Sequence, residues 1–210
     1  MSGQEPAAIW FCGDTHGRFD HLRRAVDLHR PKAVILLGDV QPSRPMEQEL
    51  GELVERTELW FIHGNHDTDT EADHDHLLDS ALTHRNLHGR VVEVAGLRIA
   101  GLGGSRLYSG GKNQYSEREM KNRIWKLGWK IRRAGGVDIV VAHAPVRGVG
   151  DGDDYAHMGF EAFLPLLDRY KPRYFIHGHV HMEYGRDIAR MLRRGDTTII
   201  NACERYTLEV

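Results

Sequence analysis

The stretch Leu59-Trp60-Phe61-Ile62-His63-Gly64-Asn65-His66-Asp67 decides how the rest of the chain is interpreted. Its apolar first half is typical of a buried strand, and Gly64 permits a sharp exit from the sheet. The amide, imidazole and carboxylate that follow are costly to bury. We therefore expect the strand to end at a cleft lined by Asn65, His66 and Asp67.

Four other apolar runs end in the same kinds of side chain. They stop at Asp14-Thr15-His16-Gly17, Asp39, His143-Ala144-Pro145 and His179-Val180-His181. Ligands of open α/β sheets bind at the carboxyl ends of the strands. The pattern therefore predicts one site built from strand ends.

The side chains at these strand ends form a set that suits metal ions. Carboxylates, imidazoles and one amide, without cysteine, favour a hard or borderline divalent ion such as Mn²⁺, Fe or Zn²⁺. Seven ligands are too many for one tetrahedral ion, but they fit two ions that share a bridging carboxylate, as used for in-line displacement at phosphorus. The seven candidates are Asp14, His16, Asp39, Asn65, His143, His179 and His181.

Length and composition set the class of protein. The chain has 210 residues, of which 40% are hydrophobic and 28% charged, with a net charge of −2. This length fits one domain spanning residues 1–210, and the balanced charge gives no whole-chain electrostatic footprint for nucleic acid. With two cysteines, no signal-peptide core and no apolar run long enough for a bilayer, we expect a cytoplasmic protein without a membrane partner.

The order of the elements predicts two kinds of sheet. Strands and helices alternate up to residue 67, with helices expected around residues 19–30 and 46–54 and Ser43 as a cap of the second helix. This alternation predicts parallel strands joined by crossover helices. Later, Val91–Val94 and Leu97–Leu102 read as a hairpin, which indicates a second sheet. The remaining expected elements are a helix through residues 160–167 interrupted early by Pro165, and closing strands at residues 197–201 and 206–210.

A basic helix is expected after the capping box Ser116-Glu117-Arg118-Glu119. Through residue 133 it carries several Lys and Arg side chains with Trp125 and Trp129 interleaved, a surface that nucleic acid could use. The simpler interpretation is a solvated helix face with the tryptophans packed along its edge.

The ordered blocks resemble those of the calcineurin-like metallophosphoesterases. The matching segments are Gly13-Asp14-Thr15-His16-Gly17, Gly38-Asp39, Gly64-Asn65-His66-Asp67, Ala142-His143-Ala144-Pro145 and Gly178-His179-Val180-His181. The resemblance implies an α/β fold, a four-layer α/β/β/α sandwich of two mostly mixed sheets flanked by helices. It also implies a dinuclear metal site at the carboxyl ends of the strands.

The same resemblance implies a role for each matching residue. Asp14, His16 and His181 would hold the first ion, Asn65, His143 and His179 the second, and Asp39 would bridge them. The ions would be Mn²⁺ and/or Fe, with Zn²⁺ as a further candidate. A metal-bridging hydroxide would attack phosphorus in line, His66 would assist the leaving group, and Asp67 would orient His66.

The expected function is metal-dependent hydrolysis of a small phosphoester, either a phosphodiester or a phosphomonoester. Val40-Gln41-Pro42 after Asp39 departs from the protein-phosphatase pattern and disfavours that activity. Arg106 and Arg147, each in a glycine-rich loop, are candidates for binding phosphate. The alternatives are a nuclease acting on single-stranded nucleic acid through the basic helix, and a non-catalytic metal-binding scaffold.

Two further histidines precede the glycines of their blocks. His63 and His177 sit at the ends of apolar runs, and we expect both to be core side chains hydrogen-bonded to backbone groups rather than metal ligands.

Overall fold

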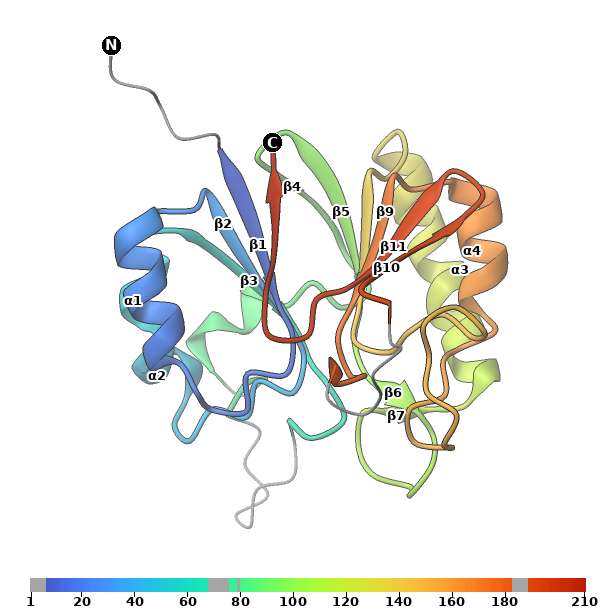
Figure 1. Ribbon diagram of the computed structural model, residues 1–210, viewed down its shortest axis with the longest axis horizontal. Coiled ribbons are helices and arrows are strands. Elements are labelled where there is room, and N and C mark those ends of the chain that lie inside the picture. The colour runs from blue at the N-terminus through green and yellow to red at the C-terminus, as the bar shows by residue number, and fades with distance from the viewer. Residues whose placement is uncertain (1–6, 68–75, 79, 183–188) are drawn as a thin grey trace.

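Two sheets packed face to face, with helices on both outer sides, form the centre of the computed structural model (Figure 1). The structure describes residues 7–67, 76–78, 80–182 and 189–210. Helices α1 and α2 cover one sheet, and α3 and α4 cover the other. This is the α/β/β/α arrangement that the sequence predicts.

The first sheet contains the parallel strands expected from the βα alternation. Its order is β12-β1-β2-β3, with β12 antiparallel to β1. The elements are β1 (Ala8–Cys12), α1 (Asp20–His29), β2 (Ala33–Leu37), α2 (Met46–Val54), β3 (Glu58–Ile62) and β12 (Tyr206–Glu209). The expected cap of α2 is wrong: Pro45 precedes the helix, and the Ser43 hydroxyl instead donates to the Glu49 carboxylate at 3.2 Å.

The second sheet is mixed and has the order β10-β11-β9-β8-β5-β4. Its strands are β4 (Val91–Val94), β5 (Leu97–Leu102), β8 (Ile139–Ala142), β9 (Tyr174–His177), β10 (Met191–Arg194) and β11 (Thr197–Asn201). The β4–β5 hairpin is confirmed, and its turn residues Ala95 and Gly96 are left-handed at φ 50° and 80°, as a type I′ turn requires. Strand β10 and the short strands β6 (Ser105–Arg106) and β7 (Gln114–Tyr115) had no clear sequence signal.

The remaining helices are α3 (Glu117–Arg133), α4 (Phe163–Tyr170) and the short 3₁₀ helix η1 (Ala81–Arg85). The capping box at Ser116 and Glu119 is confirmed at the start of α3. Pro165 does not interrupt α4, because it lies in the first turn, where a backbone N–H has no partner within the helix.

Alternate residues of the central strands face different cores. In β2, Ala33, Ile35 and Leu37 pack toward the opposite sheet. Val34 and Leu36 pack beneath α1 and α2. All five β2 side chains are fully buried, which explains why the strand reads as a continuous apolar run. Polar side chains can therefore appear only where such strands end.

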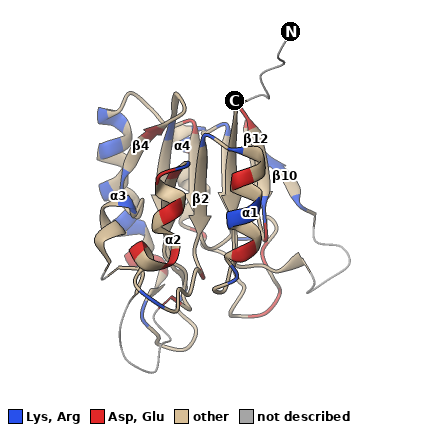
Figure 2. Cartoon of the chain, turned by 90° about the vertical axis from the view of Figure 1, so that its left-hand side faces the viewer, with Lys and Arg blue, Asp and Glu red and all other residues tan. Residues whose placement is uncertain are grey.

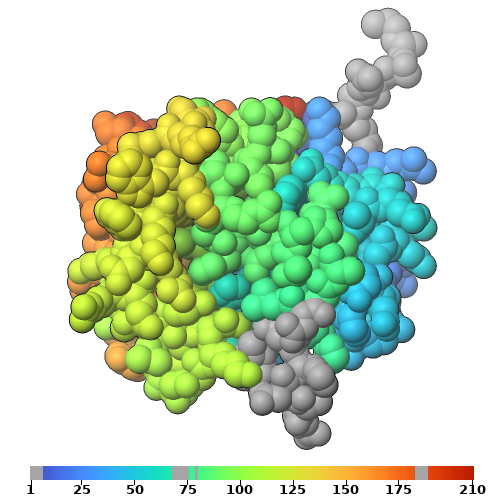
Figure 3. Space-filling model, turned by 180° about the vertical axis from the view of Figure 1, so that it is seen from behind, coloured from blue at the N-terminus to red at the C-terminus, as the bar shows by residue number. Residues whose placement is uncertain are grey.

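Helix α3 differs from its prediction at its tryptophans. Trp125 and Trp129 remain 65% and 58% exposed, so they are not packed along the edge of the helix. Lys and Arg residues recur along the same helix, which is coloured blue at these positions in Figure 2. The helix occupies one side of the rear face of the molecule, in yellow-green in Figure 3.

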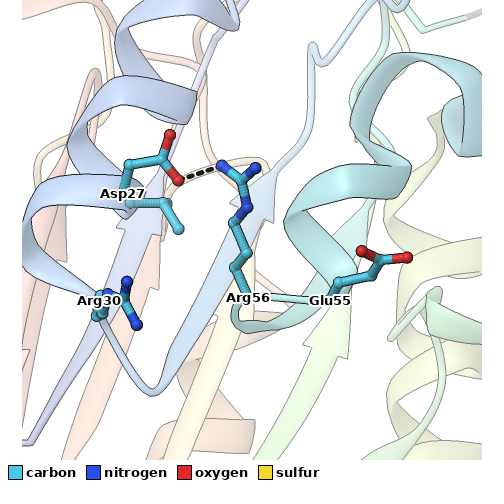
Figure 4. A pocket seen from close by; sticks show the side chains of 5 residues that line it. Asp27, Arg30, Glu55 and Arg56 are labelled. Carbon is cyan, nitrogen blue, oxygen red and sulfur yellow. Dashed lines mark hydrogen bonds and ion pairs between the residues drawn. The ribbon is translucent and has the colours of Figure 1, made fainter.

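A polar cavity of ≈ 510 Å³ lies between the carboxyl ends of α1 and α2 (Figure 4). Arg30 and Glu55 contribute to its lining, and the Asp27 carboxylate pairs with the Arg56 guanidinium across it. Because these helices run back along their strands, this cavity is at the edge opposite the strand carboxyl ends. No helix in the described part of the chain is long and apolar enough to cross a bilayer.

Two glycines with different surroundings test the packing. A Cβ on Gly51, inside α2, would meet nothing within 4 Å. Gly51→Ala should therefore raise the free energy of unfolding by about 0.5–1 kcal/mol, since alanine restricts the unfolded chain and favours a helix. A Cβ on Gly101 would lie 2.6 Å from the Leu87 Cβ and 2.7 Å from its carbonyl oxygen. Gly101→Ala should lower the same free energy by about 1–3 kcal/mol. Denaturant titrations of both variants check this, and a loss at Gly51 or a gain at Gly101 would contradict it.

Candidate metal centre

The loops that follow the parallel strands of both sheets meet at one edge. The Asp14 N–H donates to the Gly38 carbonyl at 3.2 Å, which ties together the ends of β1 and β2. The Gly178 N–H donates to the His143 carbonyl at 3.2 Å, which ties together the ends of β9 and β8. Across the sheets, the His179 N–H donates to the Asp14 carboxylate at 3.0 Å. Side chains far apart in sequence are therefore neighbours.

The predicted ligands form two groups at this edge. In each group three ligand atoms lie within 4.8 Å of one another; the groups are Asp14, His16 and His181, and Asp39, His143 and His179. The Asn65 amide oxygen lies 3.0 Å from His143 Nε2 and so belongs to the second group. All seven candidate residues thus lie in or beside these two groups. Asp39 lies in the second group, and its role as a bridge stays a prediction.

Hydrogen bonds to oxygen acceptors fix the orientation of three of the four candidate imidazole ligands. His143 Nδ1 donates to the Leu37 carbonyl at 2.8 Å, so Nε2 is the nitrogen available to a metal. His16 Nδ1 donates to the Gln41 side-chain oxygen at 2.6 Å. His179 Nε2 donates to the Ala156 carbonyl at 2.8 Å. Each ring keeps its other nitrogen for coordination.

The electrostatics of the site favour a cation. Burial alone would lower the pKa of His143, but the carboxylates of Asp39 and Asp14 raise it to about 9. Burial opposes ionisation of Asp39, yet His143 holds the pKa of Asp39 below its usual range. Burial and the charge of Asp39 raise the pKa of Asp14. The carboxylates of Asp14 and Asp39 are only 4% and 2% exposed, so their ionised forms need nearby positive charge. Divalent ions supply more of this charge than one imidazolium does. The donor set fits such ions.

Several site residues adopt the left-handed backbone conformation, which is unfavourable for L-amino acids. Five of the ten non-glycine residues with positive φ in the described part of the chain are Asp14, His16, Asp39, Gln41 and His179, with φ between 45° and 66°. Each such residue costs on the order of 1 kcal/mol and persists only where surrounding contacts enforce it. Strained positions therefore cluster among the candidate ligands and Gln41.

Gly64 is required for a close approach between loops. A Cβ at this position would collide with the backbone nitrogen and the carboxylate of Asp39. Its φ is not positive, so the glycine serves the contact between the ends of β2 and β3 rather than an unusual turn.

Gln41 and Asp67 connect the loops that carry His16 and His66 through hydrogen bonds. The Gln41 amide accepts from His16 and donates to the His66 carbonyl at 3.1 Å. The Asp67 carboxylate accepts from the backbone N–H groups of Gln41 at 2.8 Å and Gly64 at 2.6 Å. Burial and the nearby Asp39 charge raise the pKa of Asp67 to about 6. The role predicted for Asp67, orienting the His66 ring, stays a prediction. Sequence reasoning missed the structural role of Gln41.

A cavity of ≈ 270 Å³ opens onto the two groups. It is lined by His16, Asp39, Asn65, His66, Tyr108, Ala156, His157, His179 and His181. The Tyr108 hydroxyl accepts from the Asn65 side-chain nitrogen at 3.0 Å, and His157 pairs with Asp154 at 2.7 Å. Sequence reasoning missed Tyr108 and His157 as site residues. The only signal was that each lies in a glycine-rich loop placed near a strand end.

The two arginines considered for phosphate binding do not line this cavity. Arg106 lies over the Tyr155 ring at 5.3 Å and contacts the Met158 sulfur. Arg147 pairs with the Asp151 carboxylate at 2.8 Å. Phosphate binding by either residue stays a prediction.

The two histidines expected in the core differ in their partners. His177 Nδ1 donates to the Gly178 carbonyl at 3.0 Å, as expected for a backbone partner. For His63 the expected backbone partner is wrong: its Nε2 lies 3.0 Å from the Tyr115 hydroxyl. Both rings are buried, which lowers the pKa of each.

Comparisons with known proteins relate both the sequence and the fold of this chain to others. The sequence profile of the calcineurin-like phosphoesterases matches residues 7–183. An uncharacterized protein of Haemophilus influenzae is 32% identical over a 199-residue alignment covering 84% of each chain. Among solved structures, the protein TT1561 of Thermus thermophilus is similar with a TM-score of 0.66 and 15% identity, over 95% of this chain and 90% of that chain.

A second solved structure shows the same fold inside a longer protein. The 5′-nucleotidase of Candida albicans SC5314 is similar with a TM-score of 0.56 and 12% identity, over 95% of this chain and 45% of that chain. At these identities the solved structures show the fold alone, whereas the sequence profile spans most of the chain. The chain therefore belongs to the calcineurin-like phosphoesterase family.

Proposed function

We propose that this protein hydrolyses a small phosphoester at two divalent metal ions. The observation that carries the proposal is the convergence of two groups of three ligand atoms, each group within 4.8 Å, at the edge shared by both sheets. The proposed ligands are Asp14, His16 and His181 for one ion, Asn65, His143 and His179 for the other, and Asp39 between them. Mn²⁺ and Fe are the preferred ions, and Zn²⁺ is a further candidate.

Ions bound there would acidify a water molecule and neutralise the charge that builds on the phosphoryl oxygens. The protein's own contribution is to hold the ligands in advance. The Leu37 carbonyl orients His143, and the Gln41 side chain orients His16. Ligands held in this way lose little freedom when the ions bind.

We propose that His66 moves a proton at the leaving group. It is half-buried and lines the cavity. The backbone N–H of His66 donates to Asp39 Oδ1 at 2.9 Å, and its backbone carbonyl accepts from the Gln41 side chain. The His66 backbone is therefore fixed on both sides. An imidazole in this position can protonate the departing oxygen, which supports the proposed role as a general acid.

The cavity favours catalysis over the scaffold alternative. A volume of ≈ 270 Å³ next to the ligands accommodates a phosphoryl group and part of its ester substituent. The Tyr108 hydroxyl and the His157 ring also line it and could contact phosphoryl oxygens. A purely structural metal site would not need an open cavity with a histidine outside the ligand groups.

The direct experiment is a turnover screen. Metal-depleted protein is refilled with Mn²⁺, Fe²⁺, Zn²⁺ or Mg²⁺ and tested on monoesters, diesters, nucleotides and short oligonucleotides. We expect turnover of at least one class of small ester that depends on added metal. Two bound ions without turnover of any ester would support the scaffold instead.

The variant His66→Ala should lower kcat by roughly 10² to 10⁴, the range for losing a general acid, while metal content stays unchanged. Turnover of a p-nitrophenyl phosphodiester and elemental analysis measure the two quantities. His84→Ala, which removes an exposed histidine of η1, is the matched control. Wild-type turnover in the His66 variant would remove this residue from the mechanism.

The variant Asp39→Asn should weaken both ion positions, because it removes a buried negative charge from the centre of the ligand set. We expect fewer than two ions per chain by elemental analysis after dialysis. Asp20→Asn, an exposed change at the start of α1, should retain the wild-type content. Two tightly held ions in the Asp39 variant would contradict a bridging role.

A further inference from the structure

Helix α3 carries a concentration of positive charge that the metal site does not use. Its 17 residues include seven Lys or Arg and two Glu, although the whole chain has a net charge of −2. In the described part of the chain, none of these seven cations forms an ion pair with a carboxylate. Six of them are exposed and present unneutralised charge to solvent, whereas Arg123 is half-buried against the Tyr115 ring. Figure 2 shows the basic residues along the helix in blue.

The two acidic residues of α3 are occupied elsewhere. Glu119 closes the capping box with Ser116. The Glu117 carboxylate accepts from the N–H groups of Glu161 at 2.9 Å and Ala162 at 3.0 Å, just before α4 begins. Both acids thus serve helix starts, where the helix dipole favours negative charge.

Two large aromatic side chains stand among the cations. Trp125 and Trp129 are 65% and 58% exposed, and their rings meet edge to face at 6.2 Å. The Arg132 guanidinium lies 4.6 Å over the Trp129 ring. By contrast, Trp10 and Trp60 are buried. Exposed indoles cost solvation free energy, so a pair of them on one helix indicates a binding surface.

A groove between α3 and α4 extends this surface. The helices approach closely at Gly128, where a Cβ would collide with the Tyr170 hydroxyl. Beside this contact lies a cavity of ≈ 250 Å³ with an apolar floor that includes Ile124 and Leu166. Trp125 and three cations, Lys121, Arg132 and Arg169, line it without any acidic residue.

We propose that the α3–α4 surface, meaning Lys121, Trp125, Lys126, Trp129, Arg132 and Arg169, binds single-stranded nucleic acid. A single strand alternates phosphates with flat bases, and this surface alternates cations with indole rings. An acidic peptide would use the cations but leave the indoles without stacking partners, and a duplex hides its base faces. The proposal concerns binding and does not depend on the hydrolytic activity proposed for the metal centre.

Binding can be measured with the full chain and a fluorescently labelled 12-nucleotide oligo(dT) in EDTA, which prevents metal-dependent cleavage. We expect anisotropy to rise with protein, affinity to fall with salt, and tryptophan fluorescence to be quenched. Trp125→Leu and Trp129→Leu should each weaken binding by about 5- to 100-fold, whereas the Phe variants should retain part of the affinity. Lys121→Ala with Lys126→Ala should flatten the slope of log K against log salt by about 1.4.

The control is Arg24→Ala with Lys32→Ala, which removes the same charge from exposed positions outside this surface and should leave the slope unchanged. Absence of binding at 50 mM salt would overturn the proposal. So would wild-type affinity in both Leu variants, equal affinity for duplex DNA, or displacement of oligo(dT) by polyglutamate at equal charge concentration. Circular dichroism of each variant verifies folding, and the Phe variants separate stacking from misfolding.

Discussion

Two carboxylates buried at the edge where both sheets end are the constraint on which the rest of the structure depends. Asp14 and Asp39 are almost inaccessible to solvent, and buried polar side chains beside them, such as Asn65 and His179, carry no negative charge. Isolated, each carboxylate would be strongly destabilising. Part of this charge is compensated by the proton on the His143 ring and by the backbone N–H groups of His179 and His66. The remaining charge is what the proposed metal ions would neutralise, and imidazole and amide side chains at the same edge would complete their coordination.

The surrounding loops are built to keep these groups in place. Left-handed backbone at Asp14, Asp39 and His179 turns the side chains inward at an energetic cost. Gly64 lets the ends of β2 and β3 approach within backbone contact. The buried Asp67 carboxylate then joins those loops through two backbone N–H groups. Close packing and hydrogen bonding thus hold these side chains in one arrangement, in spite of the strained backbone.

The fold and the candidate ligands can be predicted from the sequence because both follow from strand ends. A strand buried on both faces must be apolar throughout, so the polar residue that ends it, such as Asp39, stands out. Contacts between distant side chains leave no such trace, and Gln41 and Tyr108 were therefore missed. The exposure of Trp125 could not be predicted from the sequence either. Helical spacing indicates the direction of a side chain but not whether another element covers it. Pro165 was misjudged because the first turn of α4 begins later than the apolar pattern indicates.

We propose above that the two groups of candidate ligands hold two ions side by side. Anomalous diffraction from crystals of the Mn²⁺-loaded protein, recorded near the manganese absorption edge, tests it most directly. We expect two strong peaks of anomalous density, with Asp39 in contact with both. One peak should lie among Asp14, His16 and His181, and the other among Asn65, His143 and His179. A single peak, or peaks away from these side chains, would contradict it.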